Sequence, residues 1–149
     1  MKFKSRKSIL LTIIFLCVSI MPTSFIALDF LNGKLNGELI FAAIVIIVSD
    51  ILIGWIYFRT YYIITENELK YRTGPFSGVI GIINIVSIEN NKSIVSYGGI
   101  KPALAGNGLL IKYNKYDELY VSPKTNKQFI NKLLEINKNI KIIDYKDRK

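Results

Sequence analysis

One carboxylate interrupts an otherwise apolar stretch of the chain. Asp50 lies in the middle of residues 39–58, which read "LIFAAIVIIVSDILIGWIYF". A charged side chain at mid-membrane costs about 2.5–3.5 kcal/mol on insertion scales, so it needs a polar partner or a proton. The functional interpretation of Asp50 is a proton or ion relay, or a docking point for another membrane protein. The structural interpretation is a neutral acid that is hydrogen-bonded between two packed helices.

The residues expected near Asp50 favour the structural interpretation. On an antiparallel partner helix, Ser19 would lie half a turn from the depth of Asp50. Gly54, one turn after Asp50, would let the two helices approach closely. Two helices also supply too few polar groups for a transporter. We therefore predict an intramembrane polar contact made by Asp50, Ser19 and Gly54, and keep the relay as the alternative.

Catalytic chemistry has little support in this composition. The 149 residues include no histidine and a single cysteine, Cys17, inside an apolar run. Without histidine, serine–histidine and cysteine–histidine catalysis, most zinc sites and the usual general base are excluded. Four glycines lack the spacing of a phosphate-binding loop, and turns explain them better: Gly98, Gly99, Gly106 and Gly108. We predict no enzymatic activity, no cofactor and no metal site.

Basic residues in the second half of the chain suggest a surface that faces anionic inner-leaflet lipids. Each would add about 1 kcal/mol of attraction close to a bilayer. The six candidates are Lys70, Arg72, Lys112, Lys115, Lys124 and Lys127. Because they alternate along predicted strands, an ordinary solvated lysine-rich surface is the alternative. The nine tyrosines follow the same alternation, as core packing requires, so we predict no nucleic-acid binding.

Two apolar segments must position these residues. Residues 9–28 and 39–58 are each long enough, at about 1.5 Å per residue, to span a bilayer core of roughly 30 Å. A cleaved signal peptide is the alternative for the first segment. It is disfavoured because Phe25 would occupy the small-residue position before the cleavage site. We therefore predict two transmembrane helices joined by an extracytoplasmic turn at residues 29–38.

The distribution of positive charge predicts the orientation of these helices. The tail of residues 1–8 carries four basic residues, whereas the turn at residues 29–38 carries one. Positive charge stays on the cytoplasmic side of a membrane, so both termini are expected inside the cell. The predicted location is the bacterial cell membrane, as a multi-pass protein. Three residues should then anchor the second helix at the inner interface: Trp55, Tyr57 and Arg59.

After the second apolar segment the hydrophobic pattern changes to a period of two. Residues 60–143 therefore predict a cytoplasmic domain of five to seven short strands, followed by a polar tail at residues 144–149. In the first hairpin, Leu69 and Tyr71 should lie on one face and Lys70 and Arg72 on the other. The second hairpin is expected at residues 109–113 and 118–122.

Shorter signals complete the predicted domain. Asn84 can cap a helical turn that directs Ile85 and Ile88 inward, and residues 94–97 predict a short strand. Thr125-x-x-Gln128 is a capping box, and the amphipathic helix after it is expected to end near residue 136. The predicted fold class is α+β: a two-helix transmembrane hairpin, then a small antiparallel barrel or sandwich with one C-terminal capping helix.

Several segments together resemble the bacterial pleckstrin-homology-like (PH-like) family of the YyaB type. The resemblance is densest from Tyr61 to Ile140, and its strongest segments are "TYYIITENELKYRTG", "PALAGNGLLIKY" and "LYVSPKTNKQFINKLLEINKNI". It implies a PH-like barrel or sandwich behind a membrane anchor. A related group includes a self-immunity protein of a bacteriocin producer. The family commonly has Ser, Asp and a basic residue at three positions that are different in this chain: Ala105, Asn107 and Gly108.

Two functions from different classes follow. The first is a membrane-anchored, non-enzymatic PH-like interaction module at the cytoplasmic face of the bacterial cell membrane, of unknown ligand. Its partners would be the lipid bilayer and a membrane or inner-leaflet protein. The alternative is a self-immunity protein that protects its cell from a secreted bacteriocin peptide. The genes beside it distinguish the two, because a peptide precursor and an exporter would indicate immunity.

Overall fold

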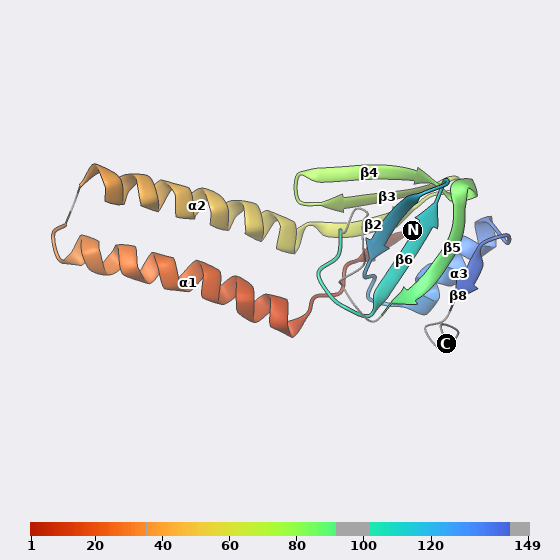
Figure 1. The fold of residues 1–149 in the computed structure, drawn as a ribbon, viewed down its shortest axis with the longest axis horizontal. Helices are drawn as coiled ribbons and strands as arrows, with labels where there is room; N and C mark the ends of the chain where they lie inside the picture. The colour runs from red at the N-terminus through yellow and green to blue at the C-terminus, as the bar shows by residue number, and fades with distance from the viewer. Residues whose placement is uncertain (35, 92–101, 144–149) are drawn as a thin grey trace.

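The structure is a computed structural model that describes residues 1–34, 36–91 and 102–143. Its most extended feature is a pair of antiparallel helices, α1 (Ile9–Leu31) and α2 (Gly37–Phe58). They project from one end of the β domain (Figure 1). Neither helix buries a residue, and both are long and apolar enough to cross a membrane. α1 continues three residues past its predicted end, and α2 starts after Asn36, whose side chain accepts a hydrogen bond from the Leu39 N–H (2.8 Å).

Two four-stranded sheets and one further helix are present in the described part of the β domain. The first is antiparallel throughout and has the order β1 (Lys2–Lys4), β2 (Thr60–Ile64), β3 (Glu68–Thr73), β4 (Phe76–Gly81). The second has the order β7 (Asp117–Val121), β6 (Gly108–Tyr113), β5 (Ile85–Asn91), β8 (Lys141–Ile143), with β8 parallel to β5. Helix α3 (Asn126–Ile136) follows β7. The predicted α+β class and PH-like sandwich are confirmed, and the two sheets do not close into a barrel.

The core lies between the sheets and α3. The predicted first hairpin is confirmed, because Leu69 and Tyr71 are buried while Lys70 is exposed. Phe129 and Leu133 direct the apolar stripe of α3 into this core. Burial of each large apolar side chain stabilises the fold by roughly 1.5–3 kcal/mol, so these alternating positions determine which face of each strand turns inward.

The segment around Ile85 differs from the predicted helical turn. A single 3₁₀ turn, η1 (Ile82–Asn84), precedes the seven-residue strand β5. Ile85 and Ile88 are both buried, as predicted, although an odd spacing should place them on opposite faces of a strand. A bulge between Ile85 and Ser87 shifts the register and directs both inward. Because of this bulge, two buried residues of a strand are three positions apart, which is the spacing typical of a helix.

Two other local predictions have different outcomes. Thr125 is the N-cap of α3, but its side chain makes no capping hydrogen bond, so the predicted capping box is wrong. Only the Thr125 carbonyl takes part, and it accepts from the Phe129 N–H (3.1 Å). The strand predicted at residues 94–97 lies outside the described residues.

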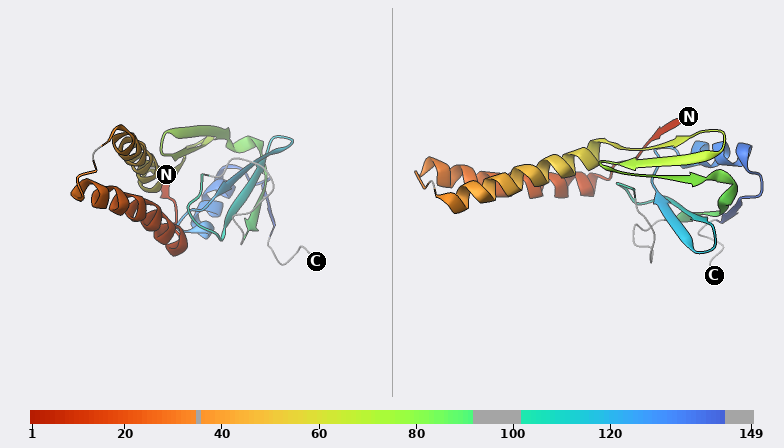
Figure 2. Two further views of the ribbon diagram at one scale, coloured as in Figure 1. Left: turned by 60° about the vertical axis from the view of Figure 1, so that its left-hand side comes forward. Right: turned by 90° about the horizontal axis from the view of Figure 1, so that it is seen from above.

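The segment of residues 1–8, expected to be a tail, contributes a strand to the first sheet, β1 (Lys2–Lys4). β1 pairs with β2 in the register Lys2–Ile63, Phe3–Tyr62 and Lys4–Tyr61. Phe3 is only 7% exposed, and its ring lies 5.1 Å from that of Phe129. The alternation Lys-Phe-Lys matches the period of a strand with one buried face. The helical hairpin is therefore an insertion between two paired strands, and both of its ends are attached to the same sheet (Figure 2).

Candidate functional site

A basic cavity lies where the helical hairpin joins the first sheet. Its volume is about 960 Å³, and no acidic residue lines it among the residues that the structure describes. Six of its ten described lining residues are basic, and the ten are Lys2, Lys4, Ser5, Arg6, Lys7, Phe58, Arg59, Thr60, Tyr61 and Lys124. We call this site the junction cavity. Because Lys2 and Lys4 flank the buried Phe3 on β1, strand alternation directs both away from the core.

Three of the six basic side chains are held in place by the protein. The Arg6 guanidinium donates to the carbonyl oxygens of Asn107, Pro123 and Lys124 and to the side chain of Asn126, each at 3.4 Å. The Lys7 ammonium lies 4.0 Å from the ring centroid of Tyr57 and 4.7 Å from that of Phe58. The Lys2 ammonium lies 4.0 Å from the Tyr61 ring. Cation–π contacts of this kind stabilise a charge without neutralising it.

The other three basic side chains are uncompensated. Within the described residues, the side chains of Lys4, Arg59 and Lys124 make no ion pair or hydrogen bond. β1–β2 pairing brings the first two together, and the Lys124 N–H donates to the Lys4 carbonyl (3.1 Å). Three cations that face one hollow without a counter-charge favour an anion, and guanidinium and ammonium groups suit carboxylate or phosphate oxygens. The junction cavity can therefore bind an anionic group.

A buried hydroxyl network supports the floor of the junction cavity. The Ser5 Oγ lies 3.0 Å from the Ser122 Oγ, and the Ser5 N–H donates to the Thr60 carbonyl (3.2 Å). The Tyr62 hydroxyl accepts from the Ser122 N–H (3.0 Å) and donates to the Pro102 carbonyl (2.5 Å). Burial raises the pKa of Tyr62 above its usual value, so its hydroxyl keeps its proton. The network fixes the N-terminal segment against the end of β7.

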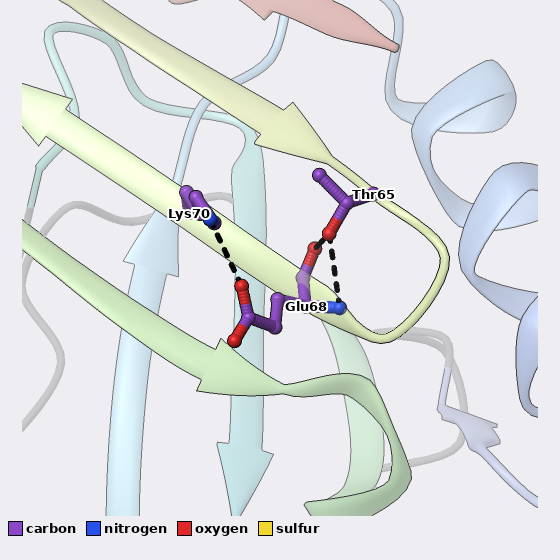
Figure 3. Close-up of polar contacts among 3 residues, drawn as sticks. All are labelled: Thr65, Glu68 and Lys70. Carbon is purple, nitrogen blue, oxygen red and sulfur yellow. Dashed lines mark hydrogen bonds and ion pairs between the residues drawn. The ribbon is translucent and has the colours of Figure 1, made fainter.

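The first hairpin neutralises one of the predicted basic residues. Lys70 forms an ion pair with Glu68 at 3.0 Å. Glu68 is in turn fixed by Thr65, which donates its hydroxyl to the Glu68 carbonyl (3.0 Å) and accepts from the Glu68 N–H (3.2 Å) (Figure 3). On the same strand, the Arg72 Nε donates to the Gly74 carbonyl (3.3 Å). Neither side chain lines the junction cavity.

The remaining predicted basic residues are dispersed over other elements. Lys112 pairs with the buried Glu89 at 2.7 Å and lies 3.9 Å from Glu118. Lys115 lies at the β6–β7 turn, and Lys127 is exposed on α3. Of the six, Lys124 alone is in the junction cavity. The structure thus does not gather the predicted set into one surface.

The basic residues that the prediction missed lie in the N-terminal segment. The positive charge of this segment predicts only the orientation of the helices, and its four basic residues are Lys2, Lys4, Arg6 and Lys7. The alternation of Lys-Phe-Lys was the available sign that the segment is a strand with one basic face. Arg59, expected as an interface anchor, lines the same cavity.

The other two expected anchors lie on α2. Trp55 is 41% exposed. The Tyr57 hydroxyl lies 2.8 Å from the Thr12 Oγ1, and its ring stacks on Phe15 with centroids 5.3 Å apart. Tyr57 therefore joins the two helices at the end nearest the junction cavity.

The expected polar contact around Asp50 is not formed by hydrogen bonds among the described residues. The Ser19 Oγ is buried without a hydrogen-bond partner, and no hydrogen bond joins it to Asp50. No atom lies within 4 Å of the position that a Cβ would take at Gly54, so that glycine is not needed for close helix approach. A functional role of Asp50 stays a prediction.

The surroundings of Gly108 explain why this chain lacks the basic residue that the resembled family commonly has at this position. A Cβ at this position would lie 2.3 Å from the Val121 carbonyl oxygen and 2.8 Å from the Tyr120 hydroxyl. The Gly108 N–H donates to that hydroxyl (2.9 Å). No side chain fits there without displacing the strand, so a basic residue at this position is excluded in this chain. Among the described residues, no group of three acidic or cysteine side chains could hold a metal ion.

Comparisons with known proteins identify a family for this chain. No curated protein matches the chain. A solved structure, the C-terminal domain of an unknown protein from Leishmania infantum, aligns at 18% identity and a TM-score of 0.40, over 52% of this chain and 66% of that one. Residues 60–137 match the family described as "Bacterial PH domain", whose span starts at β2 and ends just after α3. Since that match covers more than half of the sequence, the chain belongs to the bacterial PH domain family.

Proposed function

We propose that this protein is a membrane-anchored, non-catalytic PH-like module whose junction cavity binds the phosphate of an anionic lipid headgroup. The observation that carries the proposal is the set of three uncompensated cations, Lys4, Arg59 and Lys124, beside the base of two apolar helices. PH domains are generally interaction modules without catalysis. A cavity open at the end of a membrane span would face lipid headgroups, where phosphate is the abundant anion.

The charge distribution along the helices supports an inner-leaflet location. The only basic residue between α1 and α2 is Lys34, and it pairs with Asp29 at 3.4 Å. All six basic residues of the junction cavity lie at the opposite end of the hairpin. Under the positive-inside rule the junction cavity and both termini are cytoplasmic, and α1 and α2 both span the membrane.

Charge removal inside and outside the junction cavity tests the proposal. The double variant Lys4→Gln/Arg59→Gln removes two uncompensated cations, whereas Lys115→Gln/Lys127→Gln removes two exposed ones elsewhere. At about 1 kcal/mol per basic residue, the first variant should weaken phosphatidylglycerol binding by about 30-fold. The control should bind like wild type.

Lipid competition in detergent-solubilised full-length protein provides the measurement. A fluorescent phosphatidylglycerol is displaced by unlabelled phosphatidylglycerol, by phosphatidylcholine or by inorganic phosphate. The proposal expects displacement by phosphatidylglycerol at the lowest concentration. Equal loss in both double variants would refute it, because net charge rather than the cavity would then control binding. Displacement by inorganic phosphate at equal concentration would identify a soluble anion as the ligand instead.

The self-immunity alternative stays a prediction. A deletion strain that remains resistant to every co-encoded peptide would eliminate it.

A further inference from the structure

The turn between β3 and β4 lies directly against the last turn of α2. The Gly74 N–H donates to the Arg59 carbonyl (3.3 Å), and a Cβ at Gly74 would lie 2.8 Å from the Ile56 Cγ1. Gly74 also has a φ of +56°, a conformation that favours glycine. The Thr60 Oγ1 donates to the Ile56 carbonyl (2.6 Å) and lies 2.7 Å from the Thr73 Oγ1. These contacts fix the turn at the level of Ile56.

This level falls inside the apolar helix rather than beyond its end. Ile56 precedes the end of α2 at Phe58 by about 3 Å along the helix axis, at 1.5 Å per residue. Trp55, the neighbour of Ile56, is 41% exposed. Figure 1 shows the tip of the β3–β4 hairpin beside the end of α2. The turn therefore reaches the depth at which a spanning helix leaves the hydrocarbon.

Two apolar side chains of this turn are exposed on the surface of the protein. Phe76 is 63% exposed, and Pro75 before it is also exposed. β4 is the edge strand of its sheet, and Phe76 opposite Thr73 is its first residue. The other end of β4 is remote from the helices (Figure 1). The turn η1 follows that end directly, and its residue Ile83 is 77% exposed. Phe76 and Ile83 are thus similar in exposure, and they differ in their position relative to the end of α2.

We propose that Pro75 and Phe76 insert into the inner interface of the bilayer beside α2, as a second membrane contact of the domain. The inference rests on the proposed placement of α2 in the membrane. The occupant is lipid because the turn is held against the same helix end that the bilayer would surround. Phenylalanine is among the apolar residues that interfacial segments bury at the boundary between headgroups and acyl chains. With attachments at both the helical hairpin and the turn, the first sheet cannot rotate freely, and the junction cavity keeps one orientation toward the headgroups.

Tryptophan fluorescence in proteoliposomes tests this contact. Trp55 is the only tryptophan of the chain, so the wild type reports on the end of α2. The variants Trp55→Phe/Phe76→Trp and Trp55→Phe/Ile83→Trp each move the single tryptophan to an exposed apolar position. Lipids brominated near the glycerol end of the acyl chains quench only tryptophans at that depth. The proposal expects the Phe76→Trp variant to lose emission to the same degree as the wild type, with a blue-shifted maximum, and the Ile83→Trp variant to lose none.

The outcomes separate the two proposals. An unquenched wild type would overturn the placement of α2 in the membrane. A quenched wild type combined with an unquenched, red-shifted Phe76→Trp variant would overturn the turn contact alone. A nitroxide attached to Phe76→Cys in a Cys17→Ser background repeats the measurement by oxygen accessibility, with Ile83→Cys as its control.

Discussion

Truncation of Phe3 is the strongest test of the N-terminal strand. In the Phe3→Ala variant the ring that lies 5.1 Å from Phe129 is lost, and a cavity opens between β1 and α3. Phenylalanine-to-alanine changes in cores cost about 3–5 kcal/mol, and an edge-to-face aromatic pair accounts for about 0.5–1.5 kcal/mol of that. Phe3 is 7% exposed on an edge strand, so we expect a loss of about 3 kcal/mol.

The matched control for Phe3→Ala is Lys4→Ala on the same strand. Lys4 is exposed, and its side chain makes no hydrogen bond or ion pair in the described structure, so its loss should change the free energy of unfolding by less than about 0.5 kcal/mol. Both variants are compared by urea unfolding of the full chain in detergent, with tyrosine near-UV circular dichroism as the signal. A Phe3→Ala variant as stable as Lys4→Ala would show that residues 1–8 are a tail and not part of the domain.

Two further predictions concern the tyrosines. Gly78→Ala would place a Cβ 2.2 Å from the Tyr71 hydroxyl oxygen and 2.3 Å from the ring carbon that bears it, so thermal unfolding should show a loss of about 1–3 kcal/mol. Because Tyr71→Phe would leave that ring carbon in place, the double variant that tests the clash is Gly78→Ala/Tyr71→Leu, whose loss should be smaller than the sum of the two single losses. Burial raises the pKa of Tyr62 and of Tyr120 above 10, so the folded state keeps both protons where the unfolded chain releases them. The free energy of unfolding should be constant up to about pH 10 and fall above it. In a series of urea unfolding curves across that range, the free energy of unfolding of Tyr62→Phe should fall less steeply with pH than that of the wild type. An equal slope would exclude Tyr62 as a source of the pH dependence.

The local patterns of the sequence were sufficient for the three α-helices and for the first hairpin. Two long apolar segments predicted α1 and α2, because helix length and hydrophobicity are properties of a single segment. Alternation predicted the first hairpin, with Leu69 inside and Lys70 outside, because strand period and burial are linked directly. Alternation did not predict β5, because the residue inserted at its bulge changes the period of buried positions along the strand.

The junction cavity depended on contacts between segments that are far apart in the chain. Lys4 and Arg59 meet because β1 pairs with β2 across the whole helical hairpin, and Lys124 joins them from the end of β7. No local pattern contains that pairing. The sequence by itself determined that the basic residues exist and which segments are apolar. Tertiary structure alone decided that Lys112 is neutralised by Glu89 of the neighbouring strand, and that Lys4, Arg59 and Lys124 face one hollow without a counter-charge among the described residues. Contacts of this kind depend on the distance between strands in space and not on spacing along the chain.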